Sequence, residues 1–193
     1  VLGIALYLSI PFTAAAVSVS PAVVWLVVFY GTTLLILTMY GGGFATIPAY
    51  LADLFGTRFV GGIHGRLLTA WSVAGILGPM AITSLRERER IAAIDELVHN
   101  TDPAAFKRRF DVGVEQLDQL VPNGTVTLLD ELVSKGTVTL GRLMEIAPQG
   151  TIDPRATLYN STMFLMASLL AVALVANLLI RPVAAKHHLD ETE

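Results

Sequence analysis

The side chains that could bind a polar ligand are conspicuous, because no charged residue occurs from Val1 to Ala52. Trp71 is the first candidate, since its indole N–H donates hydrogen bonds and a bound anion would accept one. The hydroxyls of Tyr40 and Thr46 lie beside a run of three glycines and are further candidates. An equally weighted interpretation places Trp71 against lipid or at the membrane interface, where tryptophan is enriched.

Asp53, Arg58 and Arg66 form a short charged segment between two apolar stretches. Such a segment is typical of a solvated loop, and we favour that interpretation. The alternative hypothesis is a gate in which Asp53 pairs with Arg58 or Arg66 in one conformation. An exposed ion pair contributes only ~0–1 kcal/mol, which is enough to bias a balanced equilibrium.

Several classes of function are disfavoured by the residues that the chain lacks. It has no cysteine, which excludes disulfides, thiolate chemistry and cysteine-ligated zinc. No HExxH motif or Ser-His-Asp order occurs, and Gly41–Gly43 lack the lysine of a phosphate-binding loop. Basic residues are not dense enough for nucleic-acid binding. We therefore expect no enzyme activity, cofactor, metal site or nucleic-acid partner.

The remaining residues divide into apolar stretches and one polar block. Of the 29 charged residues, 21 lie within 86–155, although 53% of the chain is hydrophobic. A bilayer crossing takes ~20 helical residues. We predict an all-α integral membrane protein, with lipid bilayer around helices at about 1–17, 22–52, 67–85 and 156–181. Pro11 should interrupt the first helix. The second stretch is longer than one crossing requires, so it should tilt, kink or overhang, with a break or bend at Gly41–Gly43 or Pro48.

The polar block at 86–155 is predicted to be a small helical insertion between the last two spans. Ile91, Ile94, Leu97 and Val98 indicate an amphipathic helix that continues the third span. Asp102-Pro103 predicts a capped helix start, and a second amphipathic piece covers 114–121. The sequence GTVTL occurs at 124–128 and again at 136–140, which predicts threonine-capped helices at 128–135 and 140–147. A polar tail at 182–193 follows the last span.

Charge placement predicts the orientation of the spans. Segment 53–66 and the tail lie on one side by parity, and their basic residues favour the cytoplasm. The insertion would then lie outside. Because Val1 begins inside an apolar run, we expect the chain to be the C-terminal part of a longer protein.

The run from Tyr40 to Pro79, YGGGFATIPAYLADLFGTRFVGGIHGRLLTAWSVAGILGP, is long and specific. It resembles the tenth helix, the following cytoplasmic loop and the eleventh helix of the oxalate/formate antiporter family of the major facilitator superfamily. The segment from Leu158 to His188 is similar to the twelfth helix and tail of that family. The ninth helix would then be 1–17, and helices one to eight would precede the chain.

The resemblance implies the C-terminal part of a twelve-helix transporter that moves a small organic anion by alternating access, in the bacterial inner membrane. The missing N-terminal helices of the same protein would be its partner. Oxalate-exchanging members carry a lysine after a Thr-Ala pair in the eleventh helix, whereas Thr69-Ala70 is followed here by Trp71. Thr69 thereby joins the candidate binding residues. The alternative function is a non-transporting, membrane-anchored module whose 86–155 domain binds a partner protein.

Overall fold

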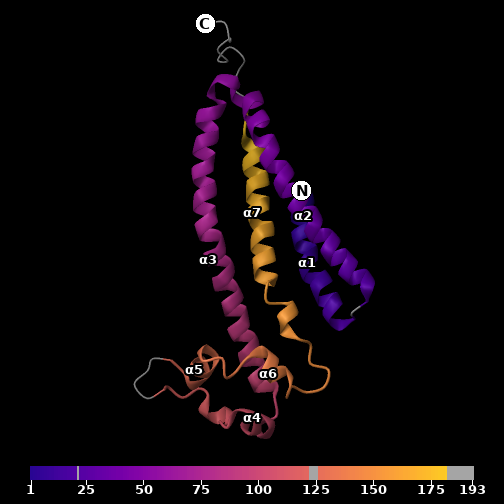
Figure 1. Ribbon diagram of the computed structural model, residues 1–193, viewed down its shortest axis with the longest axis vertical. Coiled ribbons are helices and arrows are strands. Elements are labelled where there is room, and N and C mark those ends of the chain that lie inside the picture. Colours follow the sequence, from indigo (N-terminus) through magenta and orange to yellow (C-terminus); the bar gives the residue numbers. More distant parts are fainter. Residues whose placement is uncertain (21, 122–125, 182–193) are drawn as a thin grey trace. The chain divides into compact units, whose positions relative to one another are not determined.

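The computed structural model describes residues 1–20, 22–121 and 126–181. Within this part all regular elements are helices, and the only extended pairing is one isolated antiparallel bridge between Leu120 and Thr127. The predicted all-α class is therefore confirmed for the described residues. The described chain forms two compact units (Figure 1): Val1–Leu85 together with residues 160–181, and Arg86–Tyr159.

The first unit contains the long apolar helices. They are α1 (Leu2–Val19), α2 (Val23–Phe55), the first part of α3 (Val60–Asn100) and α7 (Asn160–Leu179). Four helical segments of the described chain are long and apolar enough to cross a membrane. Since a helix satisfies its own backbone hydrogen bonds, this is the form in which such segments enter lipid. These helices indicate a membrane-embedded protein.

The predicted interruption at Pro11 is wrong, and so is a break at Gly41–Gly43 or Pro48, whereas a bend there stays a prediction. Helix α1 continues through Pro11, and α2 continues through the three glycines and through Pro48. A proline removes one backbone hydrogen bond. Ending a helix leaves several donors and acceptors unpaired. For an apolar segment the continuous helix therefore has fewer unpaired groups than an interrupted one.

The link between α2 and α3 is shorter than the predicted 53–66 loop. Helix α2 extends to Phe55, a 3₁₀ turn, η1, covers Thr57–Phe59, and α3 begins at Val60. Gly56 makes the reversal possible, because its φ of 82° is a conformation that side-chain-bearing residues rarely adopt. The last helix also differs from its predicted bounds. A 3₁₀ turn, η3, covers Pro154–Ala156, and α7 begins only at Asn160.

Helix α1 packs against both α2 and α7. A glycine at position 3 permits this close approach, since a Cβ there would lie 3.2 Å from Leu170 Cδ1 and 3.8 Å from Met39 Cε. Close contact through small residues is the usual way in which helices associate in lipid, where burial of apolar surface gives little driving force.

The second unit, Arg86–Tyr159, has a hydrophobic core of its own. The end of α3 contributes Ile94, Leu97 and Val98, which confirms the predicted amphipathic helix, although Ile91 is exposed. The other elements are α4 (Pro103–Phe110), η2 (Val114–Gln116), α5 (Leu128–Ser134), α6 (Leu140–Met144) and η3. Buried residues of these elements and of the segments that follow or connect them complete the core: Phe106, Phe110, Leu117, Leu129, Val138, Leu140, Leu143 and Leu158.

Side-chain caps set the starts of the short helices in this unit, as predicted. The Asp102 carboxylate accepts from the N–H groups of Ala104 and Ala105. Thr127 and Thr139 each accept from the backbone three residues later, at Asp130 and Arg142. A cap of this kind satisfies donors that the first helical turn leaves free.

The predicted amphipathic piece at 114–121 is only partly correct. It contains a single 3₁₀ turn, and Leu117 is 2% exposed whereas Leu120 is 66% exposed. Backbone pairing across the Leu120–Thr127 bridge replaces the helix there. The start of the first GTVTL copy and the tail at 182–193 lie outside the described residues.

Candidate functional site

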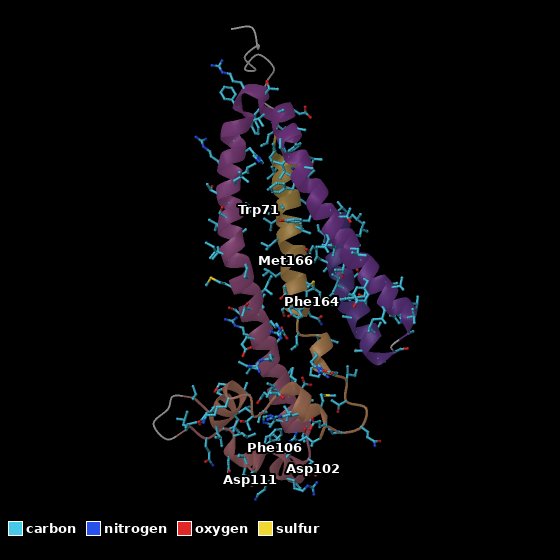
Figure 2. The ribbon with its side chains drawn as sticks, in the orientation of Figure 1. Trp71, Asp102, Phe106, Asp111, Phe164 and Met166 are labelled. Atoms are coloured by element: carbon cyan, nitrogen blue, oxygen red, sulfur yellow. The ribbon has the colours of Figure 1, made fainter. Side chains whose placement is uncertain are left out.

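Two of the predicted site residues meet in an aromatic cluster between α2 and α3. The rings of Tyr40 and Trp71 have centroids 5.5 Å apart, at an interplanar angle of 41°. Phe44 packs edge-on against Trp71 at 5.0 Å and 72°. Figure 2 marks Trp71 on α3. Edge-to-face ring pairs of this kind are favourable by about 0.5–1.5 kcal/mol beyond burial.

The spacing on α2 explains how the cluster forms. Tyr40 and Phe44 are four residues apart and share one helix face, which they present to Trp71. Gly41, Gly42 and Gly43 lie between them, and a Cβ at any of the three would meet nothing within 4 Å. Phe44 was not among the predicted site residues. Its four-residue spacing from Tyr40 is the sequence signal that could have identified it.

The two predicted threonines do not join this cluster. Thr46 and Thr69 each lie two residues from a cluster member, and residues at this spacing point to different sides of a helix. Their hydroxyls donate to their own helices: Thr46 to the carbonyls of Gly42 and Gly43 at 3.2 and 3.0 Å, and Thr69 to that of Arg66 at 2.6 Å. Each oxygen can still accept a hydrogen bond, so their role in binding stays a prediction.

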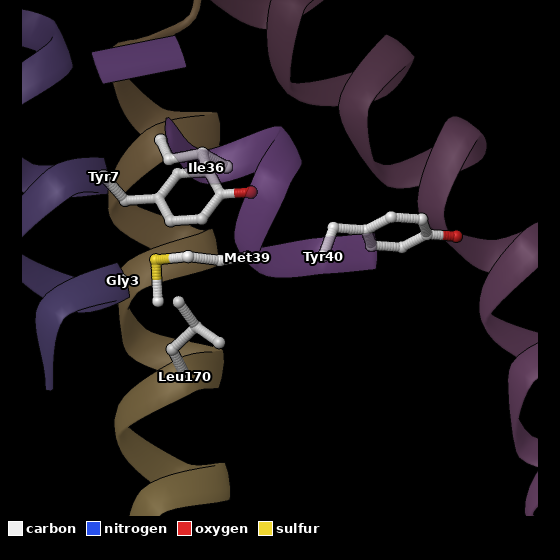
Figure 3. Close-up of a pocket in the computed structure, with 6 residues that line it drawn as sticks. All are labelled: Gly3, Tyr7, Ile36, Met39, Tyr40 and Leu170. Atoms are coloured by element: carbon white, nitrogen blue, oxygen red, sulfur yellow. The ribbon is translucent and has the colours of Figure 1, made fainter. Parts of the chain in front are cut away.

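A cavity of about 250 Å³ adjoins the base of Tyr40 (Figure 3). It lies among α1, α2 and α7 and is lined by Gly3, Tyr7, Ile36, Met39, Tyr40 and Leu170. The ring of Tyr40 points away from the other lining side chains, towards α3. Tyr40 therefore belongs to both features. The cavity is smaller than the roughly 300–1,000 Å³ typical of drug-sized ligands, so only a small molecule would fit.

The charged candidates lie near the α2–α3 turn. Asp53 is exposed in the last turn of α2, Arg58 lies in η1, and Arg66 is exposed on α3. In the described part of the chain no ion pair joins Asp53 to either arginine. The gating hypothesis requires such a pair in one conformation, and it stays a prediction.

Paired charges characterise the second unit. A hydrogen bond from Arg90 lowers the pKa of Glu87, and one from Arg155 lowers the pKa of Asp153. The pKa of His99 is raised, chiefly because its ring bonds the Asp95 carbonyl oxygen at 2.8 Å. These contacts are local, between residues two to four positions apart. These three contacts are typical of solvated helix faces, and a fourth pair, Arg109 with Glu145 at 2.8 Å, joins residues that are distant in the chain.

The ends of this unit are joined by a further contact. The guanidinium of Arg86 lies 5.6 Å from the centroid of the Tyr159 ring. These are the first and last residues of the unit. A cation–π contact at an exposed position contributes about 0.5–1 kcal/mol.

Comparison of the chain with protein-family models, with curated proteins and with solved structures gives no match in any of the three. The chemistry of the site therefore has to be argued from its own residues. The aromatic cluster offers two polar groups, the Trp71 indole N–H and the Tyr40 hydroxyl. The Tyr40 ring points away from the apolar cavity, so its hydroxyl does not face that cavity. Neutral donors among aromatic rings suit reversible binding of a small molecule.

Proposed function

We propose that the chain forms the last four helices of a twelve-helix carrier of the major facilitator superfamily, similar to the oxalate/formate antiporters. The carrier moves a small carboxylate across the membrane by alternating access. The observation that carries this proposal is the aromatic cluster of Tyr40, Phe44 and Trp71 between two apolar helices. All three residues lie in the run that resembles the family.

The chemistry of the cluster favours a small anion. The edge of an aromatic ring is electropositive, and the indole N–H and the phenol O–H are donors. Carboxylate oxygens accept hydrogen bonds from such groups. No cation follows Thr69-Ala70, because Trp71 occupies that position. A single negative charge is therefore easier to balance here than two, so we propose a monocarboxylate such as formate or lactate in preference to oxalate.

A transport assay tests this proposal. The protein that contains the chain is reconstituted in proteoliposomes, and uptake of labelled formate, lactate, pyruvate and oxalate is measured. We expect saturable uptake of the monocarboxylates. Trp71→Ala should raise the KM about tenfold, which corresponds to losing about 1.4 kcal/mol of binding. The matched control is Trp25→Ala on α2, since the aromatic contacts described for the spans do not include Trp25.

Two results would contradict the proposal. One is the absence of uptake of all four anions by a correctly inserted protein. The other is an equal effect of the two tryptophan substitutions, because the cluster would then have no special part in binding. Eight further apolar spans encoded upstream of Val1 would support the twelve-helix arrangement, and a reading frame without them would refute it.

The separate core of Arg86–Tyr159 favours a second candidate function. In this alternative the helices anchor the domain in the membrane and the domain binds a partner protein. Deletion of 86–155 distinguishes the two candidates. A carrier would keep some uptake when a short linker replaces the insertion, whereas an anchored binding module would lose its function entirely.

A further inference from the structure

One side-chain hydrogen bond joins α2 to α7 near the C-terminal ends of both helices. Asn177 Nδ2 donates to the Tyr50 hydroxyl oxygen, and the two atoms are 3.1 Å apart. An asparagine within an apolar span is expected to bond a neighbouring helix, and Asn177 does so. Tyr50 was not foreseen as the partner. It lies outside the aromatic cluster but on the same helix as Tyr40 and Phe44.

This bond differs in kind from the other hydroxyl contacts described in the spans. Those contacts return to carbonyl groups three or four residues earlier on the same helix, so they do not fix one helix against another. An amide in an apolar span has no water to bond, and a partner on another helix is therefore favoured over none. The Tyr50–Asn177 bond ties two spans together.

The α2 segment between the cluster and Tyr50 has weak internal support. Pro48 has no N–H, so the carbonyl of Phe44 lacks its usual partner four residues later. Gly41–Gly43 add backbone freedom, because each glycine loses more conformational entropy in a helix than alanine does. Phe44 lies between the glycines and the proline, and its ring contacts Trp71. The part of α2 that holds the cluster can therefore bend more easily than a regular helix.

We propose that Tyr50 and Asn177 are positioning residues, whose hydrogen bond holds the C-terminal part of α2 against α7 and so keeps Tyr40 and Phe44 packed on Trp71. This inference rests on the proposed transport function. With the bond made, Phe44 and Tyr40 stay packed on Trp71. With the bond broken, the segment after Gly43 moves away from α7 and the three rings separate, which exposes more of Trp71 than the 45% already exposed in the structure.

The expected effect is modest and measurable. Interhelical hydrogen bonds in membranes average ~0.6 kcal/mol in double-mutant cycles. This corresponds to an approximately threefold change in the ratio of separated to joined helices. The effect is large enough to shift a balanced equilibrium and small enough that the helices still insert and pack without the bond.

Spin labels provide the first measurement. The chain contains no cysteine, so Ala49→Cys on α2 and Leu178→Cys on α7 create two defined labelling sites. Distances are measured by pulsed electron resonance with the chain in lipid nanodiscs. Tyr50→Phe and Asn177→Leu should each increase the separated population about threefold, and the double variant should do no more. Tyr30→Phe is the matched control, since the hydrogen bonds described for α2 do not involve the Tyr30 hydroxyl.

Fluorescence provides the second measurement, on a Trp25→Phe background in which Trp71 is the only tryptophan of the chain. Tyr50→Phe should make Trp71 more accessible to acrylamide. Unchanged distance distributions in both single variants would overturn the proposal that the Tyr50–Asn177 bond holds α2 against α7. Changed distances with unchanged quenching of Trp71 would overturn the proposal that the Tyr50–Asn177 bond keeps the aromatic cluster packed. Both measurements are independent of transport, so failure of the uptake assay would contradict the proposed function and leave these results standing.

Discussion

Two leucines of the unit Arg86–Tyr159, only three residues apart, should respond very differently to the same truncation. Leu117 is 2% exposed and belongs to the core of Arg86–Tyr159, whereas Leu120 is 66% exposed. Leu117→Ala removes about three buried carbon groups at ~0.8 kcal/mol each and leaves a cavity, which together amount to about 3 kcal/mol. Leu120→Ala deletes the same atoms, but here they are exposed to solvent, so the stability should change by less than about 0.5 kcal/mol.

The assays are urea unfolding and thermal unfolding of residues 86–159, each followed by circular dichroism. The unit has its own core, and the contact between Arg86 and Tyr159 brings its ends together, so we expect the excised segment to fold. In a domain of this size 1 kcal/mol shifts the melting temperature by about 4–8 °C, so Leu117→Ala should lower it by on the order of 15 °C.

Equal losses of stability in the two variants would refute the reasoning. The side chain of Leu120 would then be buried, as the amphipathic pattern at 114–121 predicts, and the bridge from Leu120 to Thr127 would be wrong. An excised segment that fails to unfold cooperatively would contradict the independent core itself.

Three further predictions concern single residues. Asp102→Ala should lower the stability of the excised unit by about 1 kcal/mol in urea unfolding, whereas Asp102→Asn keeps the cap and should have little effect. His99 is the only histidine of 86–159, and NMR titration should find its pKa above 6.5. The charged form of His99 therefore stabilises the folded unit fully below pH 6.5, and this stabilisation is lost as the pH rises through the folded-state pKa. The shift should partly survive Asp95→Asn, since its largest cause is the backbone contact. Gly56→Ala should destabilise the detergent-solubilised chain by about 1–3 kcal/mol in thermal unfolding, because φ is 82° there, whereas the helical Gly61→Ala should not.

Much of the fold was predictable because its causes are local in the chain. The uncharged stretches require helices in lipid wherever they lie, and the four spans follow from composition alone. The caps at Asp102, Thr127 and Thr139 are equally local, since each side chain bonds to a backbone two or three residues later.

The sequence was less informative where two local preferences compete. Pro11 and Gly41–Gly43 weaken a helix by their intrinsic propensities, and the predicted interruptions followed from that. The apolar surroundings favour the opposite outcome, because a break exposes more unpaired backbone than one proline does. At Leu120 the amphipathic pattern was outweighed by backbone pairing to a segment that follows in the chain.

For the candidate site, too, some features follow from the sequence and others depend on the tertiary structure. The sequence alone determined which groups could bind an anion, because side-chain chemistry is a property of each residue: the indole of Trp71 and the hydroxyl of Tyr40. Only the tertiary structure placed Tyr40 and Phe44 against Trp71 and paired Tyr50 with Asn177. Contacts between helices depend on how each helix is rotated about its axis against its neighbours. That rotation is set by packing between residues as far apart as Gly3 and Leu170.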